Sequence, residues 1–147
     1  FPGCAITTDV MVGFAGETEE EFQESLRFVE DIGFARVHVF AYSRRPGTKA
    51  YNALGQVPAP VKESRSKTMA AAARAGQQAY YQSQLGKIYP VLFEQETGGQ
   101  IYEGHTPQYT PVRVQSSRPL SGKVLPVLLT ATEEEFCTGV LAEEQGT

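Results

Sequence analysis

The chain has 147 residues, of which 41% are hydrophobic, and its formal net charge is −4. It can bury one ordinary domain or two small ones, and no apolar run is long enough to cross a membrane. The N-terminal residues contain neither a methionine nor the charged segment of a signal peptide. We therefore expect a cytoplasmic chain that continues a longer protein at its N-terminal side.

Charge is divided unevenly along the sequence. Residues 1–33 contain one basic and eight acidic residues, a net charge of −7, and residues 124–147 contain five acidic residues and no basic one. Residues 34–123 contain twelve basic and four acidic residues, a net charge of +8. A basic middle suits an anionic partner such as RNA, and an uneven scatter of solvated charges is the alternative.

The first predicted element is a β-strand that leads into a helix through a glycine turn. Residues 10–12 form a short apolar run, and Gly13 and Gly16 interrupt it. Thr18 and Glu21 then have the spacing of a helix capping box. Ligands of α/β proteins bind beyond the carboxyl ends of such strands, so we expect the N–H groups of both glycines to be free donors. A tight turn without a ligand is the alternative.

The next two elements complete a β-α-β unit. An amphipathic helix is expected over residues 19–32 with Gly33 as its stop, and a strand over residues 36–42. Two strands joined by a helix pair in parallel, and such a pair cannot bury both faces of its sheet. We therefore expect sequence outside this chain to supply the neighbouring strands. His38, in the second strand, is either structural or directed at a substrate or cofactor.

A polar loop and a long helix follow. Residues 43–50 read Ser-Arg-Arg-Pro-Gly-Thr-Lys-Ala, and this composition suits an anion site or a rigid surface turn. The helix is expected over residues 59–85, where helix formers are frequent and Gly86 can end it. Gly76 costs this helix about 1 kcal/mol relative to Ala, so we expect a close packing contact there.

The remaining sequence changes to short strands separated by glycine turns. Strands are expected over residues 88–94, 100–105, 111–115, 124–132 and 136–142. The first two form a hairpin about Gly98 and Gly99, and Pro126 is expected at an edge or a bulge. Five short strands with glycine turns, in a segment with too few residues for a sandwich, predict a small closed barrel. The expected fold class is therefore α/β over residues 1–85 followed by all-β over residues 86–147.

Two loop motifs resemble segments of the radical S-adenosylmethionine (SAM) methylthiotransferases. Residues 9–18, Asp-Val-Met-Val-Gly-Phe-Ala-Gly-Glu-Thr, match one family motif except at Ala15, where the family usually has proline. The second motif lies in residues 42–50 and is matched at Tyr42, Ser43, Arg45, Gly47, Thr48 and Ala50. Together with residues 38–40, residues 56–58, Val61, Lys62 and Arg65, it is most similar to the subfamily that acts on threonylcarbamoyladenosine in tRNA.

The C-terminal strands resemble the TRAM domain, a small RNA-binding barrel at the end of these enzymes. The likeness is carried in order by Gly86, residues 91–94, residues 104–106, Tyr109, Val112, Val114, Gly122 and Gly139. The two resemblances imply a C-terminal βαβα fragment of a partial TIM-type radical SAM barrel, followed by a five-stranded TRAM-like barrel.

The resemblance also implies a function for the full-length protein. This family adds a methylthio group to C2 of a modified adenosine beside the tRNA anticodon, with SAM and two 4Fe-4S clusters as cofactors and the tRNA anticodon stem-loop as partner. By resemblance, Arg45 and Thr48 lie near SAM or the substrate. Arg113 alternates with Val112 and Val114, so we expect it to face solvent and, with Arg118 and Lys123, to meet RNA phosphates. The SAM site itself is implied at Gly13, Phe14, Ala15, Gly16 and Glu17.

Cluster ligands are missing from the sequence. Radical SAM enzymes hold their cluster through three cysteines in a C-x3-C-x2-C segment, whereas this chain contains only Cys4 and Cys137. We expect these two to be free thiols, although a disulfide is possible, and we expect no metal site and no catalysis from the fragment alone. A free-standing RNA-binding module is one alternative. Another is the sister methylthiotransferase that acts on an aspartate of a ribosomal protein.

Overall fold

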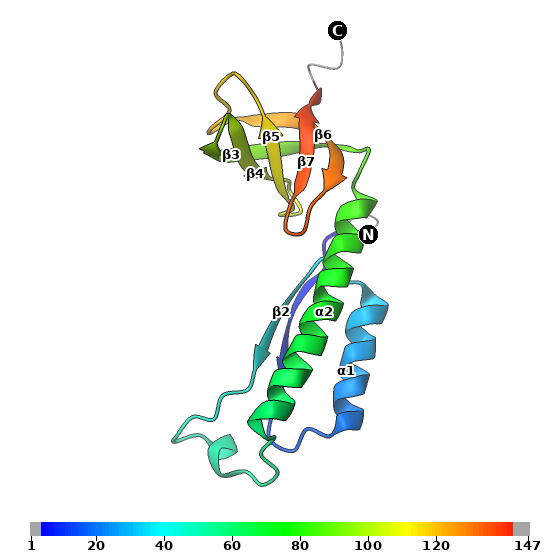
Figure 1. Ribbon diagram of the computed structural model, residues 1–147, viewed down its shortest axis with the longest axis vertical. Helices are drawn as coiled ribbons and strands as arrows, with labels where there is room; N and C mark the ends of the chain where they lie inside the picture. Colours follow the sequence, from blue (N-terminus) through cyan, green and yellow to red (C-terminus); the bar gives the residue numbers. More distant parts are fainter. Residues whose placement is uncertain (1–3, 143–147) are drawn as a thin grey trace. The chain divides into compact units, whose positions relative to one another are not determined.

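The computed structural model describes residues 4–142, and the expectations for residues 1–3 and 143–147 lie outside the described residues. Contacts divide the chain into two compact units (Figure 1). Of the described residues, 6–77 form the β-α unit, and 78–142 with 4 and 5 form the barrel unit. None of the helices in the described part of the chain combines the length and apolar composition of a membrane span.

The β-α unit is built on two parallel strands joined by a helix. β1 (Thr7–Val12) pairs along its whole length with β2 (Arg36–Ala41), so that Val10 lies opposite Val39. α1 (Glu19–Ile32) connects the two strands. The predicted parallel β-α-β arrangement is therefore confirmed.

The ends of α1 follow from its sequence. The capping box is complete, because the N–H of Glu21 donates to Thr18 Oγ1 (3.1 Å) and the N–H of Thr18 donates to Glu21 Oε1 (3.2 Å). Three glutamates occupy the first turn, where the helix dipole favours negative charge. Gly33 ends the helix in the left-handed conformation, with a φ of 67°.

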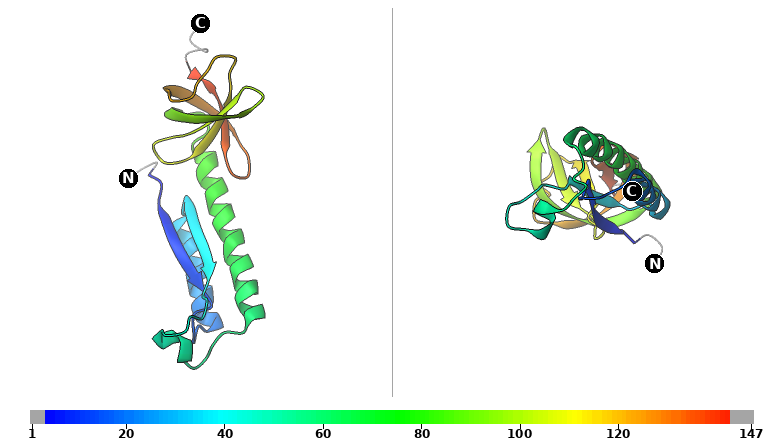
Figure 2. Two further views of the ribbon diagram at one scale, coloured as in Figure 1. Left: turned by 90° about the vertical axis from the view of Figure 1, so that its left-hand side faces the viewer. Right: turned by 90° about the horizontal axis from the view of Figure 1, so that it is seen from below.

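Both helices pack against one face of the strand pair (Figure 2). α2 (Ala59–Ser83) contributes to the same buried cluster as α1. At Gly76 an added Cβ would lie 3.1 Å from the carbonyl oxygen of Phe34, which confirms the expected close contact. The fully buried members of the cluster are Val12, Phe22, Val29, Phe34 and Met69.

The other face of the strand pair is exposed. Asp9 and Met11 from β1, and His38 and Phe40 from β2, are all exposed, and they alternate with valines that are buried or partly buried. The rings of His38 and Phe40 lie 5.7 Å apart on this face. Within the described residues, the helices therefore cover one face of this two-stranded sheet and leave the other face exposed, as expected for a lone β-α-β unit.

The barrel unit is a closed five-stranded barrel in the order β3-β4-β5-β7-β6. The β5–β7 pair is parallel, and the other neighbouring pairs are antiparallel. The predicted closed barrel is confirmed, although β3 extends beyond the expected residue 94. The strands are β3 (Ile88–Gly98), β4 (Ile101–His105), β5 (Pro111–Gln115), β6 (Val124–Thr132) and β7 (Cys137–Leu141).

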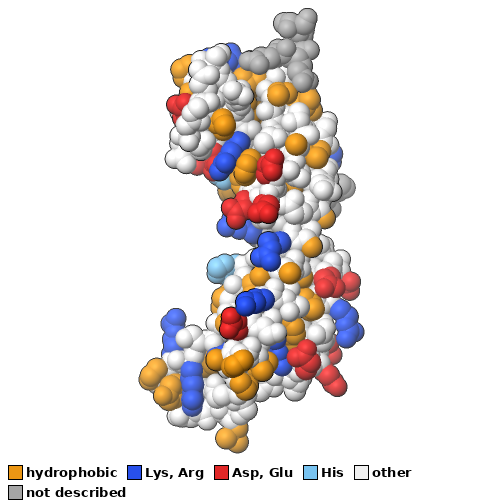
Figure 3. Space-filling view, in the orientation of Figure 1, with side chains coloured by type: hydrophobic (Ala, Val, Ile, Leu, Met, Phe, Trp, Pro, Cys, Tyr) orange, Lys and Arg blue, Asp and Glu red, His pale blue; other side chains and the backbone are white. Residues whose placement is uncertain are grey.

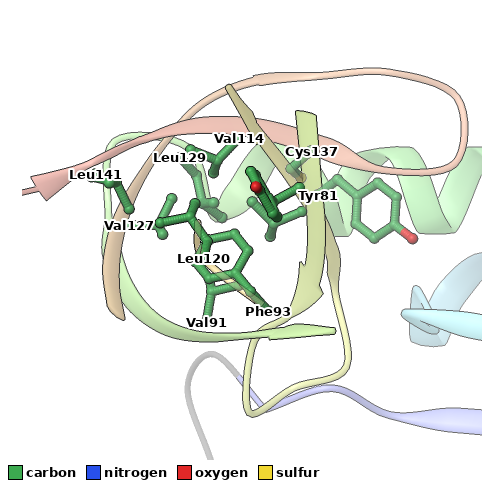
Figure 4. Packing of buried hydrophobic residues seen from close by; sticks show 11 residues of the cluster. Tyr81, Val91, Phe93, Val114, Leu120, Val127, Leu129, Cys137 and Leu141 are labelled. Atoms are coloured by element: carbon green, nitrogen blue, oxygen red, sulfur yellow. The ribbon is translucent and has the colours of Figure 1, made fainter. Parts of the chain in front are cut away.

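Apolar side chains from all five strands fill the barrel (Figure 4). Two glycines allow the strands to approach one another closely at its wall. A Cβ on Gly104 would lie 2.3 Å from the carbonyl oxygen of Leu92, and one on Gly139 would lie 2.6 Å from that of Leu128. The labelled side chains in Figure 4 include Val91, Phe93, Val114, Leu120, Val127, Leu129 and Leu141.

The last turns of α2 belong to the barrel unit, and the predicted domain boundary at residue 85 lies beyond them. Tyr81 is buried in the barrel core (Figure 4). Gln84 is also buried, and its Oε1 accepts a hydrogen bond from Thr110 Oγ1 (2.8 Å). Its Nε2 donates to the hydroxyl of Tyr80 (3.1 Å).

One local expectation, that for Pro126, was wrong. Pro126 lies opposite Pro90 in a closed barrel, not at an edge, and the irregularity of β6 falls between Leu129 and Ala131. The pairing of β6 with β7 begins one residue later, at Val127. Because Pro126 has no partner in β7, its missing N–H does not break the hydrogen bonds between these two strands. In addition, the loop after β2 contains an unexpected 3-10 helix, η1 (Lys49–Asn52).

Candidate functional site

The glycine loop, residues 13–17 after β1, closes on itself. Gly13 and Gly16 have φ values of 77° and 84°, which glycine adopts readily. The N–H of Gly13 donates to Glu17 Oε1 (3.0 Å), and the N–H of Gly16 donates to the carbonyl oxygen of Gly55 (2.8 Å). The expectation that both N–H groups are free donors is therefore wrong.

Glu17 holds the glycine loop to α2 through Arg65. Arg65 Nη1 lies 2.8 Å from Glu17 Oε1, and it also donates to the carbonyl oxygen of Glu17 (3.2 Å). Both side chains are nearly buried, at 9% and 13% exposure. Arg65 Nη2 reaches the carboxylate of Glu19 (3.2 Å), and the guanidinium lies over the ring of Phe22.

The pKa of Glu19 is lowered, first by the hydrogen bond that Gln23 donates and then by the charge of Arg65. Sequence reasoning had included Arg65 in the family likeness without assigning it a role. No periodicity or motif in the sequence connects it to a loop 48 residues earlier.

Lys62 supports the other side of the glycine loop. The Lys62 ammonium donates to the carbonyl oxygen of Tyr42 (3.2 Å). Its aliphatic stem packs against Gly13 so closely that a Cβ added to Gly13 would lie 2.3 Å from Lys62 Cγ. Phe14 packs edge-on against Tyr42, with ring centroids 5.0 Å apart. Phe14 nevertheless remains 47% exposed.

The cationic loop, residues 43–50, uses some of its polar groups internally. Thr48 Oγ1 donates to the carbonyl oxygen of Arg45 (2.8 Å), which forms a tight turn. Arg44 donates to the carbonyl oxygen of Tyr51 and stacks over its ring at 4.4 Å. Neither arginine makes an ion pair with a described residue, and Arg45, unlike Arg44, has no side-chain hydrogen bond or ring contact among them.

The structure brings the glycine loop and the cationic loop to the same end of the sheet. β1 and β2 are parallel and in register from Thr7 to Ala41, so the loops after them begin side by side. The hydrogen bond between Gly16 and Gly55 ties the glycine loop to the segment that leads into α2. The surface over this end shows Lys and Arg beside exposed hydrophobic side chains (Figure 3). Residues 13–17, Arg45 and Thr48 therefore belong to one end of one unit.

On the barrel, Arg113 faces outward as its alternation with two valines predicted. Val112 and Val114 are buried, whereas the Arg113 guanidinium is 2.9 Å from Glu103 Oε2 and lies 4.1 Å over the ring of Phe136. The charge of Arg113 is thus already partnered on the barrel surface.

Arg118 and Lys123 lie on the connection between β5 and β6. The backbone of Arg118 is fixed by Ser116, whose Oγ accepts from its N–H (3.2 Å) and donates to its carbonyl oxygen (3.0 Å). The backbone of Lys123 is fixed by Leu120 and Phe93, and its side chain is exposed.

The described side chains offer no ligand set for an iron–sulfur cluster. Among residues 4–142, no three His, Cys, Asp or Glu side chains gather in a group that could hold a metal ion. Cys4 is exposed and Cys137 is buried, and both are free thiols. Burial raises the pKa of the Cys137 thiol to about 11. The described residues therefore do not fit a cluster.

The sequence matches no protein-family model. It is 40% identical over 143 residues to threonylcarbamoyladenosine tRNA methylthiotransferase MtaB of Chlamydia pneumoniae, covering 94% of this chain and 33% of that protein. The chain thus spans about a third of the length of this relative. Among solved structures, a conserved protein of Methanococcus maripaludis is 26% identical over 40% of this chain and 79% of its own, with a TM-score of 0.35. The predicted relationship to methylthiotransferases is confirmed by the first comparison.

Proposed function

We propose that this chain, related to a tRNA methylthiotransferase over 94% of its length, is the C-terminal part of such an enzyme. The full-length protein would add a methylthio group to C2 of threonylcarbamoyladenosine beside the tRNA anticodon. A tRNA substrate would place it in the cytoplasm.

One observation carries this proposal: the 40% identity extends through both units. A free-standing RNA-binding barrel would account for the barrel unit alone. It would leave unexplained a β-α unit that exposes one whole face of its strand pair, including Met11 and Phe40. That open face supports the proposal that a missing N-terminal portion supplies further strands of a partial TIM-type barrel.

We assign the SAM site to the end of the sheet where Gly13, Phe14, Ala15, Gly16 and Glu17 meet the cationic loop, with Arg45 and Thr48 near SAM or the substrate. Support comes from the parallel register, which puts both loops beyond adjacent strand ends. The exposed Phe14 ring provides a surface on which an adenine can stack.

The loop amides are already bonded, so the role of this chain's own residues is to hold the loop rigid. Glu17 and Arg65 fix it from one side and Lys62 from the other. When bound, SAM would supply the radical and the methyl group. Two 4Fe-4S clusters, held by residues outside this chain, would act together with it.

We assign tRNA binding to the barrel unit, with Arg113, Arg118 and Lys123 meeting phosphates of the anticodon stem-loop. Support comes from the outward direction of Arg113 and from the exposed side chain of Lys123. Phosphate contacts of this kind do not depend on base sequence.

Deletion of the gene that encodes this chain tests the proposal. Nucleosides from total tRNA are separated and identified by mass spectrometry in the parent and deletion strains. The proposal predicts loss of methylthiolated threonylcarbamoyladenosine, with the unmethylthiolated nucleoside in its place. Unchanged tRNA nucleosides together with an unmodified ribosomal-protein aspartate would instead identify the sister enzyme, and no change in either would favour the binding module.

A further inference from the structure

A groove on the outside of the barrel is not used by the proposed phosphate contacts. Its floor follows from strand register: Val124 of β6 lies opposite Leu92 of β3, and Leu92 lies opposite His105 of β4. The volume of the groove is about 420 Å³. Its lining consists of Pro90, Leu92, Glu94, His105, Thr106, Pro107, Tyr109 and Val124.

Tyr109 lines this groove and has an energetically unfavourable backbone conformation. Its φ is 64°, which bulky residues rarely adopt, and its side chain is 81% exposed. Such conformations persist when the surrounding structure dictates them, and they gather at ligand sites. Nothing in the barrel core requires this ring, because it points to solvent.

The loop that carries Tyr109 is tied down on both sides. The N–H of Tyr109 donates to the carbonyl oxygen of Thr106 (2.9 Å), and the N–H of Thr106 donates to that of Thr110 (3.1 Å). Thr106 and Thr110 are buried, and Thr110 is bonded to the buried Gln84 at the end of α2. The loop is therefore a rigid support that presents an aromatic ring.

The groove also has a polar wall, and a lysine directly precedes one of its lining residues in the sequence. His105 Nδ1 lies 2.7 Å from Glu94 Oε1, so imidazole and carboxylate groups border an otherwise apolar floor. Lys123 directly precedes Val124, and its ammonium makes no ion pair with any described residue. An aromatic platform, a hydrogen-bonding edge and a nearby cation are the three features that bind an unpaired nucleotide.

We propose that this groove binds one unpaired nucleobase of the RNA partner, stacked on Tyr109, with the adjoining phosphate at Lys123. The inference rests on the proposed function, which supplies tRNA as the RNA partner. A tRNA presents unpaired bases in its loops. Paired bases are excluded, because their faces are covered by their neighbours in the duplex.

The test uses the 147-residue chain and a short single-stranded RNA that carries one 2-aminopurine, whose fluorescence changes on stacking. Tyr109→Gly removes the ring and relieves the positive φ, and Tyr109→Phe keeps the ring. Gln100→Gly is the matched control, because Gln100 has a φ of 65° on the turn between β3 and β4. We expect Tyr109→Gly to weaken binding on the order of tenfold and to abolish the fluorescence change. Tyr109→Phe and Gln100→Gly should resemble the unchanged chain.

A salt series separates stacking from charge. Tyr109→Gly should leave the slope of log affinity against log salt unchanged, whereas Lys123→Ala should lower it by about 0.7 on single strands. The inference is overturned if Tyr109→Gly and the unchanged chain bind the single-stranded RNA with equal affinity. It is also overturned if Tyr109→Gly loses as much affinity for a fully paired RNA as for the single strand. Absence of RNA binding also overturns it and leaves the groove as a surface for a protein. These outcomes are independent of the tRNA nucleoside analysis, which tests the proposed function.

Discussion

Arg65 and Glu17 form an ion pair, 2.8 Å between Nη1 and Oε1, that is almost shielded from water. The same carboxylate oxygen accepts the N–H of Gly13, so one acidic residue fixes both the turn after β1 and its attachment to α2. A turn held in this way is positioned before any ligand arrives, which reduces the ordering that binding must accomplish.

Arg65→Met should destabilise the β-α unit by about 3–5 kcal/mol, because it leaves the buried charge of Glu17 without its partner. Lys67→Met on the same helix is the control. Lys67 pairs with Glu63, but these side chains are 77% and 70% exposed, so that change should cost about 1 kcal/mol or less. Hydrogen exchange of the β1 and α1 amides reports the difference, and equal losses would show that the Arg65 pair does not hold this unit.

Gly13→Ala should destabilise the unit more than Gly16→Ala. Both residues have positive φ, so either alanine should cost about 1–2 kcal/mol in backbone strain. A Cβ at position 13 also overlaps the stem of Lys62, whereas a Cβ at position 16 meets no atom within 4 Å. Lys62→Ala should therefore recover part of the loss in the Gly13→Ala chain. Strictly additive free energies of unfolding in this double-mutant cycle would contradict the overlap.

Cys137 should be unreactive in the folded barrel. Its thiol is buried and its pKa is raised to about 11, so almost no thiolate is present at pH 8. A disulfide-exchange reagent should label one thiol per chain, at the exposed Cys4, and none in Cys4→Ser. Both cysteines should react after unfolding. Rapid labelling of two thiols in the native chain would show that the core opens.

The same thiol makes barrel stability depend on pH. The folded pKa lies above the ordinary value of 9, so the unfolded chain loses this proton first as pH rises. The contribution of Cys137 is therefore fully present below pH 9 and is lost progressively between about pH 9 and 11. Urea midpoints should decline over this range less in Cys137→Ala than in the unchanged chain, and identical declines would contradict the assignment.

Replacing Arg113, Arg118 and Lys123 by alanine should weaken tRNA binding and lower the salt slope by roughly two units. The effect should fall short of one unit per cation, because Arg113 already pairs with Glu103. A chain with Arg27, Lys67 and Arg74 replaced has the same net charge and is the control. Filter binding across a salt series compares the two, and equal slopes would remove the barrel from the RNA interface.

Local signals in the sequence predicted the elements well. The capping box and Gly33 fixed both ends of α1, and alternation in β5 showed that Arg113 faces outward. These features depend on neighbours within a few residues. Non-local partners escaped prediction. The N–H of Gly16 donates to the carbonyl oxygen of Gly55, and Glu17 pairs with Arg65. The sequence near residues 13–17 contains no signal that predicts either partner.

The barrel groove escaped prediction for a related reason. Leu92, His105 and Val124 are far apart in sequence and become neighbours only through strand register. Tyr109 appeared as part of a family likeness, but its exposure depends on hydrogen bonds between Thr106 and Thr110 that the sequence does not reveal.

The most direct measurement is the reaction itself. Full-length protein, reconstituted anaerobically with iron and sulfide, is incubated with SAM, a reductant and tRNA from the deletion strain, and the nucleosides are identified by mass spectrometry. The account predicts that methylthiolated threonylcarbamoyladenosine appears, and that it is absent when SAM is withheld. If the protein binds the tRNA and cleaves SAM but leaves threonylcarbamoyladenosine unchanged, the assignment of this chain to a tRNA methylthiotransferase is contradicted.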